Sequence, residues 1–73
     1  MPHIIVKMHK GRTEEMKQAM VEKMREAVVE TIGCPENVVT FAVEDYEPSD
    51  FKELFKKDVA ETKGKLYFVN EKE

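Results

Sequence analysis

Apolar residues follow two different spacings along this chain, and the change of spacing divides it into elements. The run 3–8, His-Ile-Ile-Val-Lys-Met, is rich in β-branched residues and predicts a strand buried on most of both faces. From position 16 to position 31 the apolar residues recur at intervals of three and four, which predicts a helix that runs to about Ile32. This apolar stripe, the packing face of a helix that covers a sheet, comprises Met16, Ala19, Met20, Met24, Ala27, Val28 and Thr31.

The residues on either side of this helix give its limits. Residues 10–12 form a turn, and Thr13 followed by two glutamates predicts an N-cap with acidic residues in the first turn, where the helix dipole favours them. Gly33 suits the C-terminal cap, and the Cys-Pro loop 34–37 cannot continue the helix. A second strand is predicted over 38–44, with one side made of Val39, Phe41 and Val43 and the other of Thr40, Ala42 and Glu44.

The C-terminal third predicts two further elements. Residues 48–50 open a short second helix, capped by Ser49 or Asp50, whose apolar face consists of Phe51, Leu54, Phe55 and Val59. Leu66-Tyr67-Phe68-Val69 predicts a final strand. The order strand, helix, strand makes the first two strands parallel. We therefore predict an α/β (α+β) fold with a single domain over 1–73, built from one βαβ unit, a second short C-terminal helix and a terminal strand.

The small size of the domain predicts self-association. A chain of 73 residues buries only about 60% of the surface that its unfolded form exposes. Cys34 is the lone cysteine, so no internal disulfide can compensate. A second copy would extend the sheet to four strands, and both a homodimer and a hexamer satisfy this requirement.

Charge and composition exclude several classes of function. Fifteen acidic and twelve basic residues give a net charge of −3 with interspersed signs, whereas nucleic-acid-binding proteins present a clustered basic face. We expect no membrane partner, because no apolar run approaches membrane-spanning length, and the single thiol and lack of a signal peptide predict a cytoplasmic protein. We also expect no metal and no cofactor, since His3 and His9 fall short of the three or four ligands of a zinc site and no phosphate-binding loop is present.

The beginning of the chain carries the most specific signal. Pro2 follows Met1 and leads directly into the first predicted strand, and the sequence Gly-Arg-Thr-Glu-Glu at 11–15 follows that strand. With these features the chain resembles the 4-oxalocrotonate tautomerase family over nearly its whole length. Residues 47–51 and the helix after them are most similar to the dimeric bacterial phenylpyruvate tautomerase-like branch.

The resemblance implies a cofactor-independent keto–enol tautomerase, an isomerase of small 2-oxo or 2-hydroxy-enoic acids. Pro2 would be the general base after removal of Met1, since an α-amine has a reference pKa of about 7.7–8.0 that desolvation and a nearby cation both lower. Arg12 would hold the carboxylate of the substrate through paired hydrogen bonds. Phe51 would wall the pocket and keep it apolar.

One position departs from the family pattern. Thr40 stands where the founding branch carries a second arginine, so we expect a monoacid rather than a diacid substrate. A compensating donor could come from His3, Lys7, Tyr46 or Tyr67. Two alternatives remain at this stage: dehalogenation or decarboxylation with Pro2 as an acid, and a non-catalytic oligomerisation module.

Overall fold

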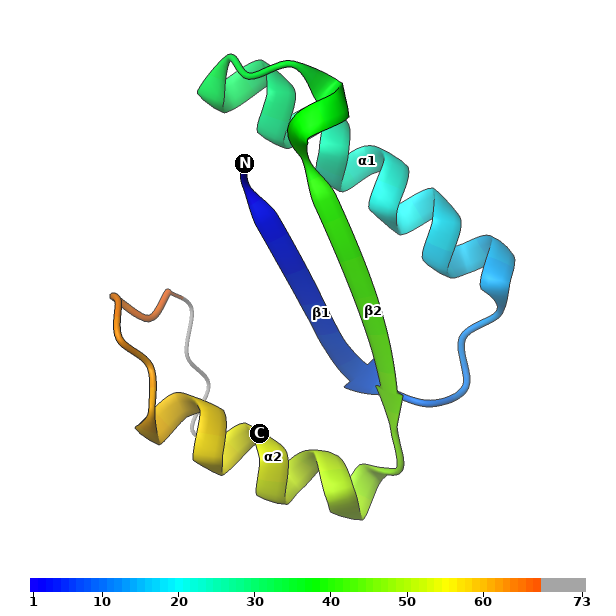
Figure 1. Ribbon diagram of the computed structural model, residues 1–73. Helices are drawn as coiled ribbons and strands as arrows, with labels where there is room; N and C mark the ends of the chain where they lie inside the picture. The colour runs from blue at the N-terminus through cyan, green and yellow to red at the C-terminus, as the bar shows by residue number, and fades with distance from the viewer. Residues whose placement is uncertain (68–73) are drawn as a thin grey trace.

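A computed structural model describes residues 1–67 of the chain, and these residues form one βαβ unit followed by a second helix (Figure 1). The predicted order of these elements is confirmed. Their bounds are β1 at His3–His9, α1 at Glu14–Ile32, β2 at Thr40–Tyr46 and α2 at Pro48–Ala60, with a short 3-10 helix, η1, at Glu36–Val38.

The two strands pair in parallel along their whole length, as a βαβ unit requires. The register runs from His3 opposite Thr40 to His9 opposite Tyr46. The Lys10 N–H donates to the Tyr46 carbonyl at 2.9 Å and so extends the pairing past the end of β1. Because the described sheet has only these two strands, each strand keeps one free edge.

Helix α1 begins and ends as the sequence predicts. The Thr13 Oγ1 accepts a hydrogen bond from the Met16 N–H at 3.1 Å, which satisfies one of the free donors of the first turn. Gly33 adopts a left-handed conformation with φ of 81°, and its N–H donates to the Val29 carbonyl.

The predicted apolar stripe of α1 is only partly right. Met20, Met24 and Val28 are half-buried, but Ala19, Ala27 and Thr31 are exposed, and Met16 keeps 57% of its surface. The half-buried positions also include Lys17, Val21 and Val29. The contact face is therefore rotated from the predicted stripe, towards Val21 and Val29.

The two helices lie on opposite faces of the sheet (Figure 1). The Lys17 Nζ of α1 lies 2.6 Å from the Asp45 Oδ2, so α1 covers the face on which Asp45 projects. The Lys7 Nζ lies 2.5 Å from the Asp58 Oδ2 of α2, and Lys7 projects from the other face by strand alternation. Helix α2 covers only part of that face, and Ile5 there remains 48% exposed.

The prediction that β1 is buried on most of both faces is wrong for the single chain. His3, Ile5 and His9 are exposed, and the remaining positions of β1 are half-buried. Among residues 1–67, Val39 alone is buried, with 9% of its surface accessible. The cause is that two strands and a partial second layer do not enclose a core, which agrees with the expected need for a second copy.

Three further differences concern the ends of elements. Strand β2 starts two residues later than predicted, because η1 forms when the Val38 N–H bonds the Pro35 carbonyl. Ser49 and Asp50 do not cap α2 but lie inside its first turn, since Pro48 occupies the first helical position, where its fixed φ is favourable. Leu66 and Tyr67 are in neither strand nor helix, and the remainder of the predicted final strand, Phe68 and Val69, lies outside the described residues.

Candidate functional site

Pro2 lies at the start of β1, beside the first residues of β2. Its carbonyl accepts a hydrogen bond from the Thr40 N–H at 3.1 Å, and its side chain is half-buried. In the full chain its nitrogen is acylated by Met1, whose amine donates to the Val38 carbonyl. The Pro2 nitrogen therefore becomes titratable only when Met1 is removed.

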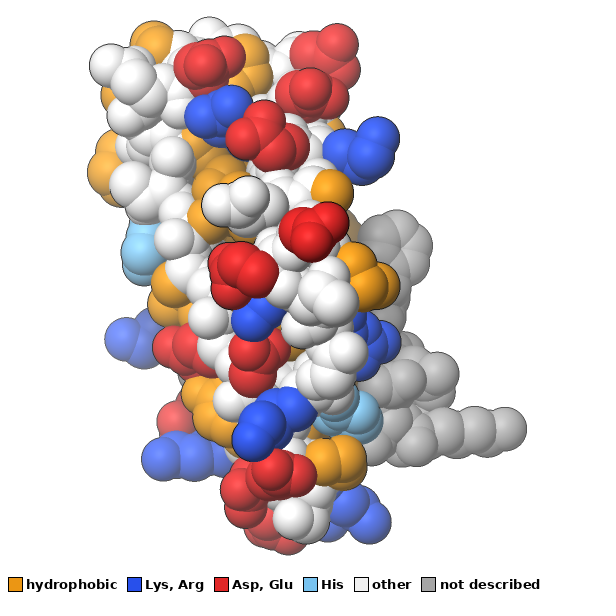
Figure 2. Space-filling view, turned by 90° about the vertical axis from the view of Figure 1, so that its right-hand side faces the viewer, with side chains coloured by type: hydrophobic (Ala, Val, Ile, Leu, Met, Phe, Trp, Pro, Cys, Tyr) orange, Lys and Arg blue, Asp and Glu red, His pale blue; other side chains and the backbone are white. Residues whose placement is uncertain are grey.

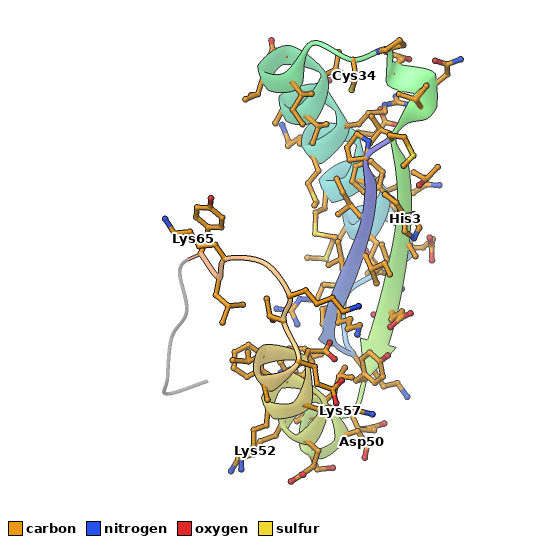
Figure 3. All side chains as sticks on the ribbon, turned by 60° about the vertical axis from the view of Figure 1, so that its left-hand side comes forward. His3, Cys34, Asp50, Lys52, Lys57 and Lys65 are labelled. Carbon is orange, nitrogen blue, oxygen red and sulfur yellow. The ribbon has the colours of Figure 1, made fainter. Side chains whose placement is uncertain are left out.

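Thr40, which replaces the expected second arginine, is also at this end of the sheet. Its Oγ1 lies 2.6 Å from the His3 Nδ1, so the two side chains satisfy each other. Figure 3 shows His3 beside the strands and well separated from α2, with Cys34 in the loop at the same end. Within one chain, His3 is therefore too far from α2 to donate to a ligand bound there.

Arg12 lies beyond the opposite end of β1. Gly11 before it has φ of 121°, a conformation that glycine adopts without strain and that turns the chain out of the strand. Arg12 is exposed, and it forms no ion pair with any of residues 1–67. Its guanidinium is thus available for an anionic ligand.

Arg12 and Phe51 share an open pocket of about 340 Å³. The other residues that line this pocket are Lys7, Met8 and His9 of β1. The Phe51 ring meets the His9 ring edge to face, with centroids 4.8 Å apart at 84°, and stacks on Phe55 at 6.1 Å. Two of the three residues predicted for the site, Arg12 and Phe51, are therefore brought together.

Lys7 and Tyr46 are held by carboxylates near this pocket. The hydrogen bond to Asp58 raises the pKa of Lys7, against a smaller opposing effect of desolvation. The Tyr46 hydroxyl donates to the Glu44 Oε1 at 2.6 Å, and this hydrogen bond together with desolvation raises the pKa of Tyr46. Lys7 thus stays protonated and Tyr46 neutral near pH 7, so neither serves as a base.

The fourth predicted donor, Tyr67, is 70% exposed, and the Lys65 Nζ lies 5.0 Å from the centre of its ring. His9 also lines the pocket with Arg12, although the sequence did not predict it as a substrate-site residue. The signal that could have found it is its position on β1, two residues after Lys7 and therefore on the same face, just before the Gly-Arg turn.

Pro2 is not brought together with Arg12 and Phe51 within one chain. Pro2 precedes β1, whereas the pocket lies at the end of β1, and the seven residues of this strand span about 20 Å. The single chain thus keeps Pro2 at one end of the sheet and the other two residues predicted for the site at the opposite end.

A second hollow, of about 240 Å³, lies between α1 and η1. It is lined by Arg25, Val29 and three glutamates, Glu26, Glu30 and Glu36, so its charge opposes the binding of a carboxylate. The outward surface of α1 likewise carries acidic and basic side chains of mixed sign (Figure 2). Neither surface is a better candidate for an anionic substrate than the pocket at Arg12.

The described residues contain no cluster of three or more His, Cys, Asp or Glu side chains arranged to hold a metal ion. The Cys34 thiol is half-buried and forms no disulfide. Over residues 1–67, no helix combines the length and the apolar composition that a membrane span requires.

Comparisons with known proteins agree on one family. A family model described as "Tautomerase enzyme" matches residues 2–52. A probable tautomerase of Bacillus cereus is 56% identical over 45 residues, which are 60% of this chain and 74% of that protein. The 2-hydroxymuconate tautomerase of Bacillus subtilis is 47% identical over 45 residues, 62% of this chain and 73% of the relative.

Solved structures give the same result. A crystal structure of a homologue of 4-oxalocrotonate tautomerase matches with a TM-score of 0.61 and 43% identity, covering 63% of this chain and 75% of the other. A structure described for trans-3-chloroacrylic acid dehalogenase activity matches with a TM-score of 0.66 and 28% identity, covering 68% and 94%.

Proposed function

The chain belongs to the tautomerase family and is an isomerase, and from this premise we propose that it interconverts keto and enol forms of a small 2-oxo acid. In this proposal the Pro2 nitrogen is the base, Arg12 binds the substrate carboxylate, and Phe51 forms the apolar wall. The observation that carries the proposal is the pocket shared by Arg12 and Phe51, which offers an unpaired guanidinium beside an aromatic ring. Because the chain belongs to a family of enzymes, a non-catalytic oligomerisation module is a poorer explanation of the chain than a tautomerase.

The proton transfer follows from the chemistry of a terminal proline. Once Met1 is removed, Pro2 carries a secondary amine with an ordinary pKa of about 7.7–8.0, and burial beside a cation lowers it towards neutrality. The neutral amine takes a proton from the enol oxygen or from the carbon next to the carbonyl. It then returns a proton to the other position, so no proton is gained or lost overall.

A second copy of the chain completes the proposed site. Two identical strands that pair about a twofold axis must run antiparallel. If two β1 strands pair through their free edges, Pro2 of one chain lies near the Arg12 end of the other, which unites all three proposed residues. Support for this arrangement comes from the free edge of β1 and from the small buried core of the single chain.

The expected substrate has one carboxylate. Arg12 supplies one anion-binding guanidinium, and Thr40 is already engaged by His3. A phenylenolpyruvate-like acid, with its single carboxylate and an aromatic group that can pack on Phe51, fits this donor set better than a diacid. The site as proposed needs no metal or cofactor.

A second candidate reaction is dehalogenation of a small unsaturated acid, as in the structural relative with trans-3-chloroacrylic acid dehalogenase activity. There a terminal proline would act as a protonated acid. Titration of the ¹⁵N-labelled Pro2 amine separates the two: a pKa at or below about 7.7 supports the base, and a pKa well above about 8 supports the acid.

The decisive experiment compares three proteins on a panel of enol acids. These are the mature chain, a chain with one uncleaved residue ahead of Pro2, and Pro2→Ala, with intact masses confirming each terminus. We expect acylation of Pro2 to lower kcat by about 100-fold to 10,000-fold, which is the usual contribution of a general base. Equal rates for the mature and the acylated chain would disprove the role of Pro2.

A further inference from the structure

The donors that could replace the missing second arginine are almost all occupied. His3 is bonded to Thr40, Lys7 to Asp58 and Tyr46 to Glu44. Of the polar side chains that line the Arg12 pocket, only Arg12 and His9 have no hydrogen-bond or ion-pair partner among residues 1–67. His9 therefore has all of its ring donors free to meet a ligand, whereas one of the three Lys7 donors is engaged by Asp58.

The position of His9 is well determined by its neighbours. It stands opposite Tyr46 as the last residue of the strand register, and the Lys10 N–H bond to the Tyr46 carbonyl fixes the backbone just beyond it. The imidazole is held edge to face against Phe51 at 4.8 Å. A side chain ordered in this way loses little conformational entropy when it binds a ligand.

We propose that His9 is a second substrate-binding residue, which donates a ring N–H to an oxygen of the same substrate carboxylate that Arg12 binds. An imidazole carries at least one N–H in both its neutral and its protonated form, so this role does not depend on its charge. The carboxylate would lie between His9 and Arg12, with the apolar part of the substrate against Phe51. The identity of the substrate rests on the proposed function, but the anion-binding role of His9 does not.

The alternative is that His9 only packs against Phe51. That role would be filled equally well by phenylalanine, which has a ring of similar shape and no N–H. Two substitutions separate donation from packing: His9→Phe keeps an aromatic ring and removes the donors, and His9→Gln keeps a donor and removes the ring.

The test measures binding and turnover separately. Binding uses 3-phenylpropanoate, a monocarboxylate that cannot enolise in the reaction, titrated by NMR into the mature oligomeric protein and the two variants. We expect His9→Phe to raise the Kd about 10-fold, as for loss of a hydrogen bond to a charged group, and His9→Gln to stay within about threefold of wild type. Turnover of an enol acid should show the same pattern in KM with a smaller change in kcat.

Three results would decide the matter. If His9→Phe binds and turns over like the wild type, His9 is a packing residue and the proposal is wrong. Weaker binding in His9→Gln without weaker binding in His9→Phe would also overturn it, because the loss of ring packing would then be the cause. If the wild type turns over no enol acid but His9→Phe still weakens binding of 3-phenylpropanoate, the proposed function fails while the role of His9 stands.

Discussion

The two ends of the sheet differ in what holds them together. At the Pro2 end the contacts come mainly from the backbone, with the Thr40 N–H on the Pro2 carbonyl and the Met1 amine on the Val38 carbonyl. At the Arg12 end, α2 adds a second layer through stacked aromatic rings and the Lys7–Asp58 ion pair. The Lys10 Nζ also pairs with the Glu47 Oε1 at 3.1 Å.

This difference suits two separate chemical tasks. At the Arg12 end Lys7 and Lys10 are paired with Asp58 and Glu47, whereas Arg12 has no ion-pair partner among residues 1–67 and can attract an anion. The Pro2 end provides a half-buried backbone nitrogen that becomes an amine when Met1 is removed. Because the proposed base and the proposed anion-binding group lie far apart within one chain, we infer that the catalytic unit is a pair of chains. The following experiments test that inference.

The largest effect is expected from mixing two impaired variants at substrate concentrations well below KM. Pro2→Ala lacks the base at one end, and Arg12→Ala lacks the guanidinium at the other. If each site takes Pro2 from one chain and Arg12 from its partner, a mixed dimer contains one intact site and one doubly defective site. Random assembly after joint unfolding and refolding then restores about a quarter of the wild-type rate.

The control for this experiment is each variant refolded alone, which should regain only its own low rate at substrate concentrations well below KM. A mixture that stays at the sum of the two separate rates would show that both residues act within one chain, and the two-chain site would be excluded. Light scattering on the same samples reports whether the chains are dimers or hexamers.

The second effect concerns Arg12 by itself. Arg12→Ala should lower kcat/KM for a monoacid enol by about 10-fold to 100-fold, mostly through KM, because a charge-assisted hydrogen bond to the carboxylate is lost. Arg12→Lys is the matched variant, since it keeps the charge but loses the planar pair of donors, and it should recover only part of the loss. Unchanged steady-state kinetics in Arg12→Ala would remove Arg12 from the site.

A smaller effect is expected at the turn that presents Arg12. Gly11 has φ of 121°, and no atom lies within 4 Å of the place that a Cβ would take, so Gly11→Ala meets no clash but strains the backbone. We expect a loss of about 1–2 kcal/mol in the free energy of unfolding, together with weaker carboxylate binding. Gly64→Ala, which also has open space around it, is the control and should change stability by less than about 0.5 kcal/mol. Urea unfolding of both variants measures the difference, and equal stabilities would show that the turn tolerates a side chain.

The smallest effect is on the pH dependence of stability. The pKa of Lys7 and that of Lys17 are raised above 10.5 by hydrogen bonds to Asp58 and Asp45, and the pKa of Tyr46 is raised above 10.0. Groups with a raised pKa stabilise the folded state at lower pH and lose that contribution as the pH rises through their folded values. Stability should thus be constant near neutrality and fall above pH about 10.

All three groups lie at the Arg12 end, so that end should open first at high pH. Amide hydrogen exchange, compared by residue at pH about 8 and about 10.5, should show faster local opening in α2 than around Val39 after correction for the intrinsic rate. A uniform change over both ends would contradict the contrast between them.

The sequence predicts the local structure well but predicts the packing between secondary-structure elements poorly. The βαβ order, the Thr13 cap and the Gly33 cap follow from residue types that act over a few positions, and they are confirmed. The rotation of the α1 contact face was not predicted, because the spacing of three and four also fits Val21 and Val29 and does not say which of two adjacent apolar rows meets the sheet.

The same distinction holds at the candidate site. Arg12 and Phe51, 39 positions apart, are expected together through a family resemblance, and the structure does bring them together. Strand alternation puts His9 on the same face as Lys7, but its contact with Phe51 depends on α2 folding back over β1, which strand periodicity does not reveal. Pro2 and Arg12 lie far apart because they stand at opposite ends of β1. The family resemblance assigns both residues to one site but does not say that they come from different chains, so it does not predict this distance.

The scarcity of buried side chains has a kinetic consequence. With only Val39 buried among residues 1–67, a lone chain gains little from collapsing by itself. We therefore expect folding to be coupled to encounter between chains, so that the refolding rate rises with protein concentration. In a dilute solution, chains would then remain without a buried core until they associate with a second chain.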